Sequence, residues 1–111
     1  MRDSLHHILG LATAFLLASI GAALADSSEE AREQKLERLV RQDCGSCHGM
    51  TFKGGLGPDI RAERMAGFTP SAIAAVILDG VPGTPMPPWR GLISEADAKW
   101  IAEHLKKGFP Q

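Results

Sequence analysis

The chain has 111 residues, a formal net charge of −1 and only two cysteines, and 44% of its residues are hydrophobic. This length allows one small domain, and the near-zero charge gives no support to nucleic-acid binding. Four Phe, two Trp and no Tyr are a thin aromatic supply, so we expect a bound group to complete the core.

The first predicted element is a secretory signal peptide over residues 1–25. Residues 8–25 carry no charge, and residues 23–25 form a small-x-small cleavage site. The alternative is an uncleaved membrane anchor, because the apolar run reaches the lower limit of about 17 residues for spanning. The cleavage site and the Gly and Ala content favour removal, and a lipoprotein anchor is excluded because no cysteine precedes Cys44. We expect a periplasmic domain over residues 26–111, without a membrane anchor.

This domain is predicted to open with a helix. Ser27 and Glu30 have the spacing of a capping box at its start. Leu36, Leu39 and Val40 then recur at helical spacing, which predicts one apolar face that continues up to the cysteines.

The attachment signature of c-type haem follows at once, as Cys44-Gly45-Ser46-Cys47-His48. On a helical turn, residues i and i+3 share a face, so both sulfurs can reach the two vinyl groups of one porphyrin. His48 can then present its imidazole to the iron. The sequence predicts one covalent haem c on Cys44 and Cys47, with His48 as the first axial ligand.

Three other readings of the two cysteines are open. A structural zinc site needs about four ligands, and the mature chain offers two cysteines and two histidines, His48 and His104, at no finger-like spacing. A thioredoxin-type redox pair would need a strand before Cys44, and no strand pattern is present there. A disulfide between Cys44 and Cys47 would close a loop too short to stabilise much.

The remaining chain is predicted to alternate between loops and helices. Residues 49–65 read as loop, since Gly54-Gly55-Leu56-Gly57-Pro58 cannot hold a helix. A helix capped by Thr69, with Pro70 at its first position, is expected to stop at Gly80.

A second loop, residues 81–89, contains four prolines, and a last helix is expected from the cap Ser94 to Lys107, before Gly108. No alternating strand pattern appears, so the predicted fold class is all-α.

The second axial ligand must come from Met50, Met65, Met86 or His104. Met50 is too close to His48 to pass round the porphyrin edge. Met65 is read as an ordinary core or surface methionine, and His104, on the last helix, as a packed or half-exposed histidine. Met86 stands between prolines that forbid helix and fix the backbone, which gives it both reach and a low entropy of placement. The alternative is a methionine that fills a gap in the core. Met86 is the predicted ligand, in a His/Met pair.

The order of the haem motif, Gly57-Pro58-Asp59, a short helix, the Met86-Pro87 loop and a terminal helix resembles a class I cytochrome c over the whole mature chain. The resemblance implies that the carbonyl of Pro58 accepts a hydrogen bond from His48 and that the indole of Trp89 lies near the haem propionates. It also implies that the first and last helices cross near Cys44 and Trp100. His104 departs from the family, which usually has an aromatic residue there.

A finer resemblance joins residues 43–50, 55–60 and 83–89 to NirC, the small periplasmic cytochromes that accompany haem-d-type nitrite reductase in denitrifying bacteria. It implies a monomeric one-electron carrier, not an enzyme, that donates electrons to that reductase. Docking is expected through the haem edge, with Lys53 and Arg90 as tuning charges or merely as solvated or propionate-binding residues. The alternatives are a haem d maturation factor, or a haem enzyme or gas sensor with an open iron site.

Overall fold

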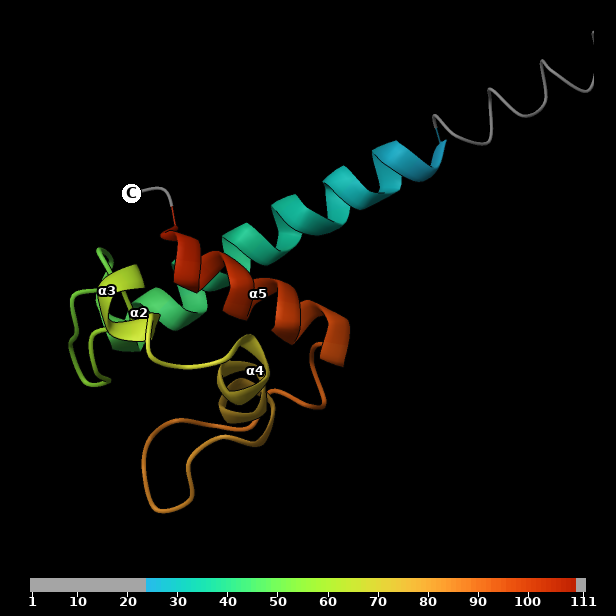
Figure 1. The fold of residues 1–111 in the computed structure, drawn as a ribbon. Helices are drawn as coiled ribbons and strands as arrows, with labels where there is room; N and C mark the ends of the chain where they lie inside the picture. Colours follow the sequence, from blue (N-terminus) through green and yellow to red (C-terminus); the bar gives the residue numbers. More distant parts are fainter. Residues whose placement is uncertain (1–23, 110–111) are drawn as a thin grey trace, which may run out of the picture. The chain divides into compact units, whose positions relative to one another are not determined.

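A computed structural model describes residues 24–109 of the chain, and within this range it contains helices and no strand (Figure 1). The all-α prediction is therefore confirmed for the described residues. The chain divides into two compact units, residues 1–35 and 36–111, which are described separately. The predicted signal peptide falls almost wholly on residues that the structure does not describe. None of the helices in the described range is long and apolar enough to cross a membrane.

In the first unit, the described residues are helical from residue 24 onward. The predicted capping box at Ser27 is wrong, because this residue lies inside the helix. Its hydroxyl donates to the carbonyl of Leu24 at 3.0 Å, and the hydroxyl of Ser28 donates to the carbonyl of Ala25 at 2.7 Å. Serine hydroxyls on a helix can bond back to the preceding turn in this way instead of capping a terminus.

The second unit begins with the end of the same helix, which is α-helical to residue 39 and then continues as the π-helical turn η1 (Val40–Cys44) and α2 (Gly45–His48). The π turn changes which residues share a face. Leu36 and Val40 are buried, and the next buried residue is Gly45, whose amide donates to the carbonyl of Val40. A regular α-helix would have put Cys44 on this buried face, four residues after Val40. The extra residue leaves Cys44 and Cys47 half-buried.

Helices α4 (Pro70–Asp79) and α5 (Glu95–Lys107) pack together and have the predicted ends. The hydroxyl of Thr69 accepts from the amide of Ala72 at 3.1 Å, and Ser94 forms a capping box with Asp97. Buried apolar residues join these helices to the end of the first one in a single core: Leu36, Val40, Phe52, Ile73, Ala74, Ile77, Leu78, Ala98, Ile101, Ala102, Leu105 and Phe109. Cys44 and Trp100 both pack against this core.

One helix was not expected. The predicted loop over residues 49–65 contains the short helix α3 (Ala62–Met65). A residue distant in sequence stabilises its C-terminal end: the ammonium of Lys106 on α5 donates to the carbonyls of Met65, Ala66 and Phe68 at 3.1, 3.0 and 2.5 Å. Lysine near a helix C-terminus satisfies carbonyls that lack a partner in the helix.

Replacing Lys106 by methionine is expected to lower the free energy of unfolding by about 1–2 kcal/mol, because charged hydrogen bonds are lost while the apolar stem is kept. Urea denaturation of the holoprotein measures the change. Lys107→Met is the matched control, because Lys107 is exposed and its substitution removes the same charge one residue away. Equal destabilisation by both variants would contradict the role of Lys106.

Candidate haem site

The two motif cysteines lie at the end of the first helix, and both are half-buried. Burial, with a smaller contribution from the negative charge of Asp43, raises the pKa of the Cys44 thiol to about 11. This environment disfavours the charged thiolate, whereas a thioether carries no charge and has no desolvation penalty of this kind. Within the described residues, no three His, Cys, Asp or Glu side chains gather as a metal site would need. The zinc reading therefore has no structural support there.

His48 ends α2, and its ring is oriented by the loop that follows. Its Nδ1 lies 2.7 Å from the carbonyl oxygen of Pro58, as the family resemblance implied. Because a carbonyl oxygen can only accept, Nδ1 donates in this bond, and in the neutral imidazole the free lone pair then lies on Nε2. A histidine in this tautomer, held by a second group, is prepared to bind a metal through Nε2.

Gly57 packs against the same ring. A Cβ atom at this position would lie 2.8 Å from both Cε1 and Nδ1 of His48 and 3.2 Å from Nε2. The loop is also tied to the motif by backbone bonds, since the amide of Gly57 donates to the carbonyl of Cys47 and that of Gly54 to the carbonyl of His48, both at 2.8 Å. The sequence pattern uses these glycines as helix breakers and Gly57 also as part of the Gly57-Pro58-Asp59 motif, and it predicts no contact of Gly57 with the histidine ring. Their close approach to the histidine is new information.

Gly57→Ala is expected to displace the His48 ring and to destabilise the fold by about 1–3 kcal/mol, the usual cost of forcing an extra methyl into a packed site. Thermal unfolding and the absorption spectrum of the holoprotein measure both effects. Gly67→Ala is the control, because a Cβ at Gly67 would have no atom within 4 Å. An unchanged Gly57→Ala protein would show that the contact is not tight.

Asp59, next to Pro58, is held by an ion pair. The guanidinium of Arg61 bonds to Asp59 at 2.7 Å through Nη2, and the backbone amide of Arg61 donates to Oδ1 at 3.0 Å. These hydrogen bonds lower the pKa of the Asp59 carboxyl to about 2. The pair holds the residue that directly follows Pro58, and it was not predicted from the sequence.

The ion pair predicts a pH dependence. The pKa of Asp59 is lower in the folded chain than the usual value of about 3.9, so the unfolded chain binds the proton first. Its stabilising contribution is present in full above about pH 4 and is lost as the pH falls toward 2. Asp59→Asn is therefore expected to flatten the fall of the unfolding midpoint between pH 4 and 2. Arg61→Gln should have the same effect, because the Asp59 carboxyl then loses its partner. If the unfolding midpoint of both variants still falls as steeply between pH 4 and 2, the stabilising role of the ion pair is wrong.

Met86 lies half-buried in the loop between α4 and α5. At the start of this loop, Gly80 has a φ of +67°, and a Cβ there would lie 2.7 Å from the carbonyl oxygen of Met86. The amide of Met86 donates to the hydroxyl of Thr84 at 3.3 Å, and its carbonyl accepts from the amide of Val81 at 3.2 Å. The Met86 backbone is therefore closely packed and hydrogen-bonded.

The other candidate ligands are Met50, Met65 and His104. Met50 is 70% exposed, and Met65 is half-buried against the core. The ring of His104 stacks on Trp100 with centroids 3.7 Å apart, and its Nδ1 donates to the Trp100 carbonyl at 2.8 Å. His104 thus takes the part of a packed ring on α5.

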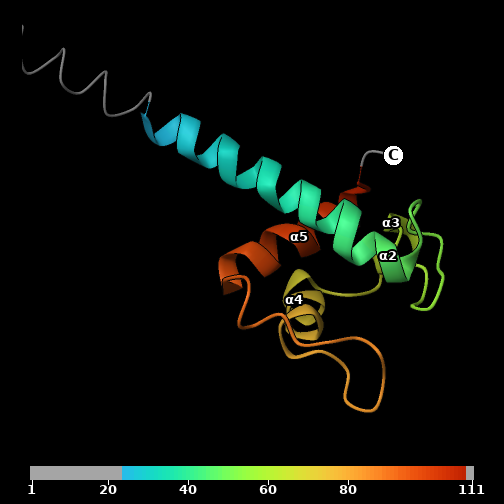
Figure 2. The ribbon, with the colours of Figure 1, turned by 180° about the vertical axis from the view of Figure 1, so that it is seen from behind.

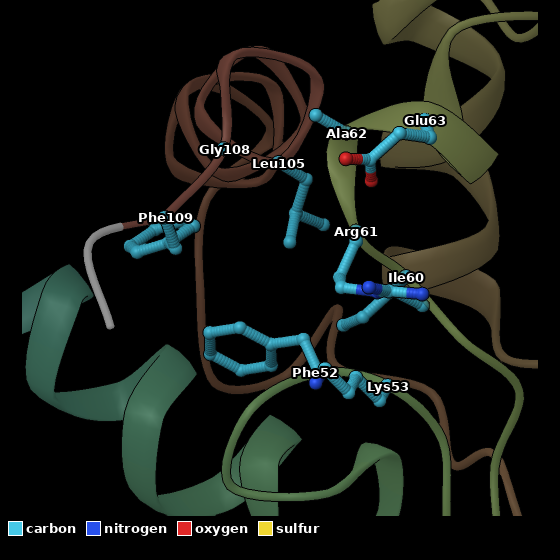
Figure 3. A pocket seen from close by; sticks show the side chains of 9 residues that line it. All are labelled: Phe52, Lys53, Ile60, Arg61, Ala62, Glu63, Leu105, Gly108 and Phe109. Carbon is cyan, nitrogen blue, oxygen red and sulfur yellow. The ribbon is translucent and has the colours of Figure 1, made fainter.

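A cavity of about 350 Å³ lies among the loop at Phe52, the start of α3 and the end of α5, and the haem motif does not line it (Figure 3). Phe52, Ile60, Leu105 and Phe109 line it, and Arg61 points toward it from the edge. Neither the two cysteines nor the two predicted ligands line this cavity, so it is not the predicted haem site.

Known proteins resemble this chain over most of its length. Residues 31–105 match the family described as cytochrome C oxidase, cbb3-type, subunit III. The chain is 51% identical over 92 residues to a cytochrome c55X of Paracoccus denitrificans, which covers 83% of this chain and 89% of that one. A cytochrome c55X of Pseudomonas aeruginosa is 45% identical over 108 residues, with 96% and 91% covered. The chain belongs to the c55X family of c-type cytochromes.

Solved structures agree with the membership in the c55X family. The c-type cytochrome NirC matches with a TM-score of 0.67 and 45% identity, covering 69% of this chain and 91% of NirC. A longer protein also matches: dihydro-heme d1 dehydrogenase of Pseudomonas aeruginosa is 32% identical over 104 residues, which is 94% of this chain but 20% of that protein. A structure of dihydro-heme d1 dehydrogenase NirN in complex with DHE has a TM-score of 0.60 and 35% identity, covering 68% of this chain and 16% of NirN. The predicted c-type cytochrome fold is confirmed.

Proposed function

We propose that this c55X cytochrome is a one-electron carrier that holds a single haem c covalently through Cys44 and Cys47, with His48 and Met86 as axial ligands. The hydrogen bond between His48 and the Pro58 carbonyl is the observation that carries the proposal, because it leaves Nε2 free for iron. When bound, haem c supplies a one-electron iron couple. With both axial positions taken by protein, no site remains for a substrate, so we propose an electron-transfer protein and not an enzyme.

Each residue has a defined part in this proposal. Pro58 fixes the tautomer and orientation of His48 and makes its Nε2 a more basic ligand for iron. Met86 supplies a thioether sulfur, which favours ferrous iron and a higher potential than a second histidine would. Trp89 is half-buried at the end of the Met86 loop, and we propose that its indole donates to a haem propionate.

We propose that the protein works in the periplasm after removal of residues 1–25 and docks as a monomer on haem-d-type nitrite reductase. Redox encounters of this kind bury under about 1,200 Å². Lys53 is exposed and can tune the docking. Arg90 is bonded to two carboxylates, which partly neutralise its charge, so its contribution to docking is expected to be small.

Stopped-flow mixing of the reduced cytochrome with oxidised nitrite reductase under nitrogen tests this donor role. Rapid oxidation of the cytochrome, only mildly dependent on salt, is expected because the chain has a net charge near zero. Absence of transfer would contradict the assignment of the reductase as partner.

A second candidate function is favoured by the similarity to dihydro-heme d1 dehydrogenase. A dehydrogenation releases two electrons, and a one-electron carrier can remove them one at a time from such an enzyme. In that case the cytochrome takes part in maturation of haem d. A strain lacking the gene for this cytochrome tests the alternative. If that strain produces nitrite reductase without its haem d, and the stopped-flow experiment shows no electron transfer, the maturation role replaces the donor role.

A further inference from the structure

Arg90 connects the two helices that flank the Met86 loop. Its Nε and Nη2 donate to Oδ1 of Asp79 at 2.9 and 2.7 Å, and its Nη1 donates to Oε1 of Glu95 at 3.0 Å. Asp79 is the last residue of α4 and Glu95 is the first residue of α5. One guanidinium therefore bonds to the end of one helix and to the beginning of the next.

The backbone around Arg90 closes the loop at the same place. The amide of Trp89 donates to the carbonyl of Leu78 at 3.0 Å, and so does the amide of Arg90, also at 3.0 Å. Residues 89 and 90 thus lie against the last turn of α4, while residues 80–88 extend away from both helices (Figures 1 and 2). The chain leaves α4 and returns to it before α5 begins, with Met86 on the segment in between.

We infer that Arg90 is a positioning residue for Met86: by joining Asp79 to Glu95, it holds the base of the loop closed and keeps the methionine sulfur in place. The inference rests on the proposed axial role of Met86. Without the guanidinium, the two carboxylates would be left near each other without a shared cation, and their repulsion would favour opening at the base of the loop.

The choice of arginine fits this role. All three groups are exposed, so each ion pair alone contributes little. The planar fork of arginine, however, can hold both carboxylates at once, whereas the single ammonium of lysine is a point charge on a flexible stem. Arg90 therefore acts by closing the loop and not by adding stability. Its loss should raise the rate at which Met86 dissociates from the iron.

Binding of imidazole to the ferric holoprotein measures this release, because the added ligand can enter only when the methionine has left. Arg90→Gln is expected to bind imidazole about three- to tenfold faster than the parent protein, the size expected for loss of two exposed ion pairs. The difference should shrink at high salt, which screens exposed charges. Arg90→Lys keeps the charge but not the planar fork, so it should bind imidazole at a rate between those of the parent protein and Arg90→Gln.

Two control variants separate positioning from charge and from general stability. Arg38→Gln removes the same charge from another exposed position, and Lys106→Met weakens the attachment of α3 without touching the loop. Both are expected to bind imidazole at the parent rate. Equal acceleration by Lys106→Met and Arg90→Gln would overturn the inference, because it would reflect overall destabilisation.

The same experiment keeps this inference apart from the proposed ligation. Met86→Ala should bind imidazole much faster than any variant above. If it does so while Arg90→Gln binds at the parent rate, the positioning role is wrong and the ligation proposal stands. If Met86→Ala behaves as the parent does, the ligation proposal itself is wrong, and the inference about Arg90 falls with it.

Discussion

Replacing Cys44 and Cys47 together by serine is expected to abolish covalent haem binding and, with it, the cooperative fold. Only Val40 and Ile101 are large side chains with almost no exposure in the described residues, while Leu56, Phe68, Val76 and Val81 are exposed apolar groups. A core this small cannot stabilise a domain of this size without help. Burial of one large apolar side chain contributes about 1.5–3 kcal/mol. A porphyrin has the apolar area of several such side chains, so its burial is comparable to the whole stability of a domain, about 5–15 kcal/mol.

Intact-protein mass spectrometry and circular dichroism of the double variant check this expectation. The parent protein should show a chain beginning at Asp26 plus one haem that survives acid–organic extraction. The variant should lack the added mass and show no cooperative melting. Ser46→Ala is the control, since this hydroxyl is exposed and lies between the two cysteines. A double variant that melts cooperatively would contradict our view of the core.

Met86→Ala is expected to open the iron to carbon monoxide and water, to change the spin state and to lower the reduction potential. The physical reason is that loss of the thioether removes the ligand that favours ferrous iron. Because the loop is held by its own backbone bonds and by the packing of Gly80, we expect it to remain folded around the smaller side chain.

Absorption spectra of the reduced protein with and without carbon monoxide measure the opening. Met65→Ala is the matched control, since this methionine packs against the core and has no assigned part at the iron. His104→Ala tests the rival ligand. A spectrum that changes with His104→Ala and not with Met86→Ala would indicate two histidine ligands. A parent protein that already binds carbon monoxide would support the haem enzyme or gas sensor.

Several features were predictable because neighbouring residues encode them. Thr69 with Pro70 and the capping pair of Ser94 and Asp97 satisfy helix amides from within a few residues, so the sequence pattern alone locates α4 and α5. The failed cap at Ser27 shows the limit of such patterns. A serine hydroxyl can equally bond backward inside a helix, and only the helix that precedes it decides which occurs.

The sequence by itself determined the haem motif and the all-α class, because both depend on residue types at short spacing. For the same reason it predicts Met86 as the second axial ligand. The tertiary structure alone decided four further features. They are the π turn that puts Gly45 on the buried face, helix α3 with its Lys106 contact, the packing of Gly57 on His48, and the bridge from Arg90 to Asp79 and Glu95. Packing determines all four: three join residues that only the folded backbone brings together, and the π turn sets which face of the first helix meets the core.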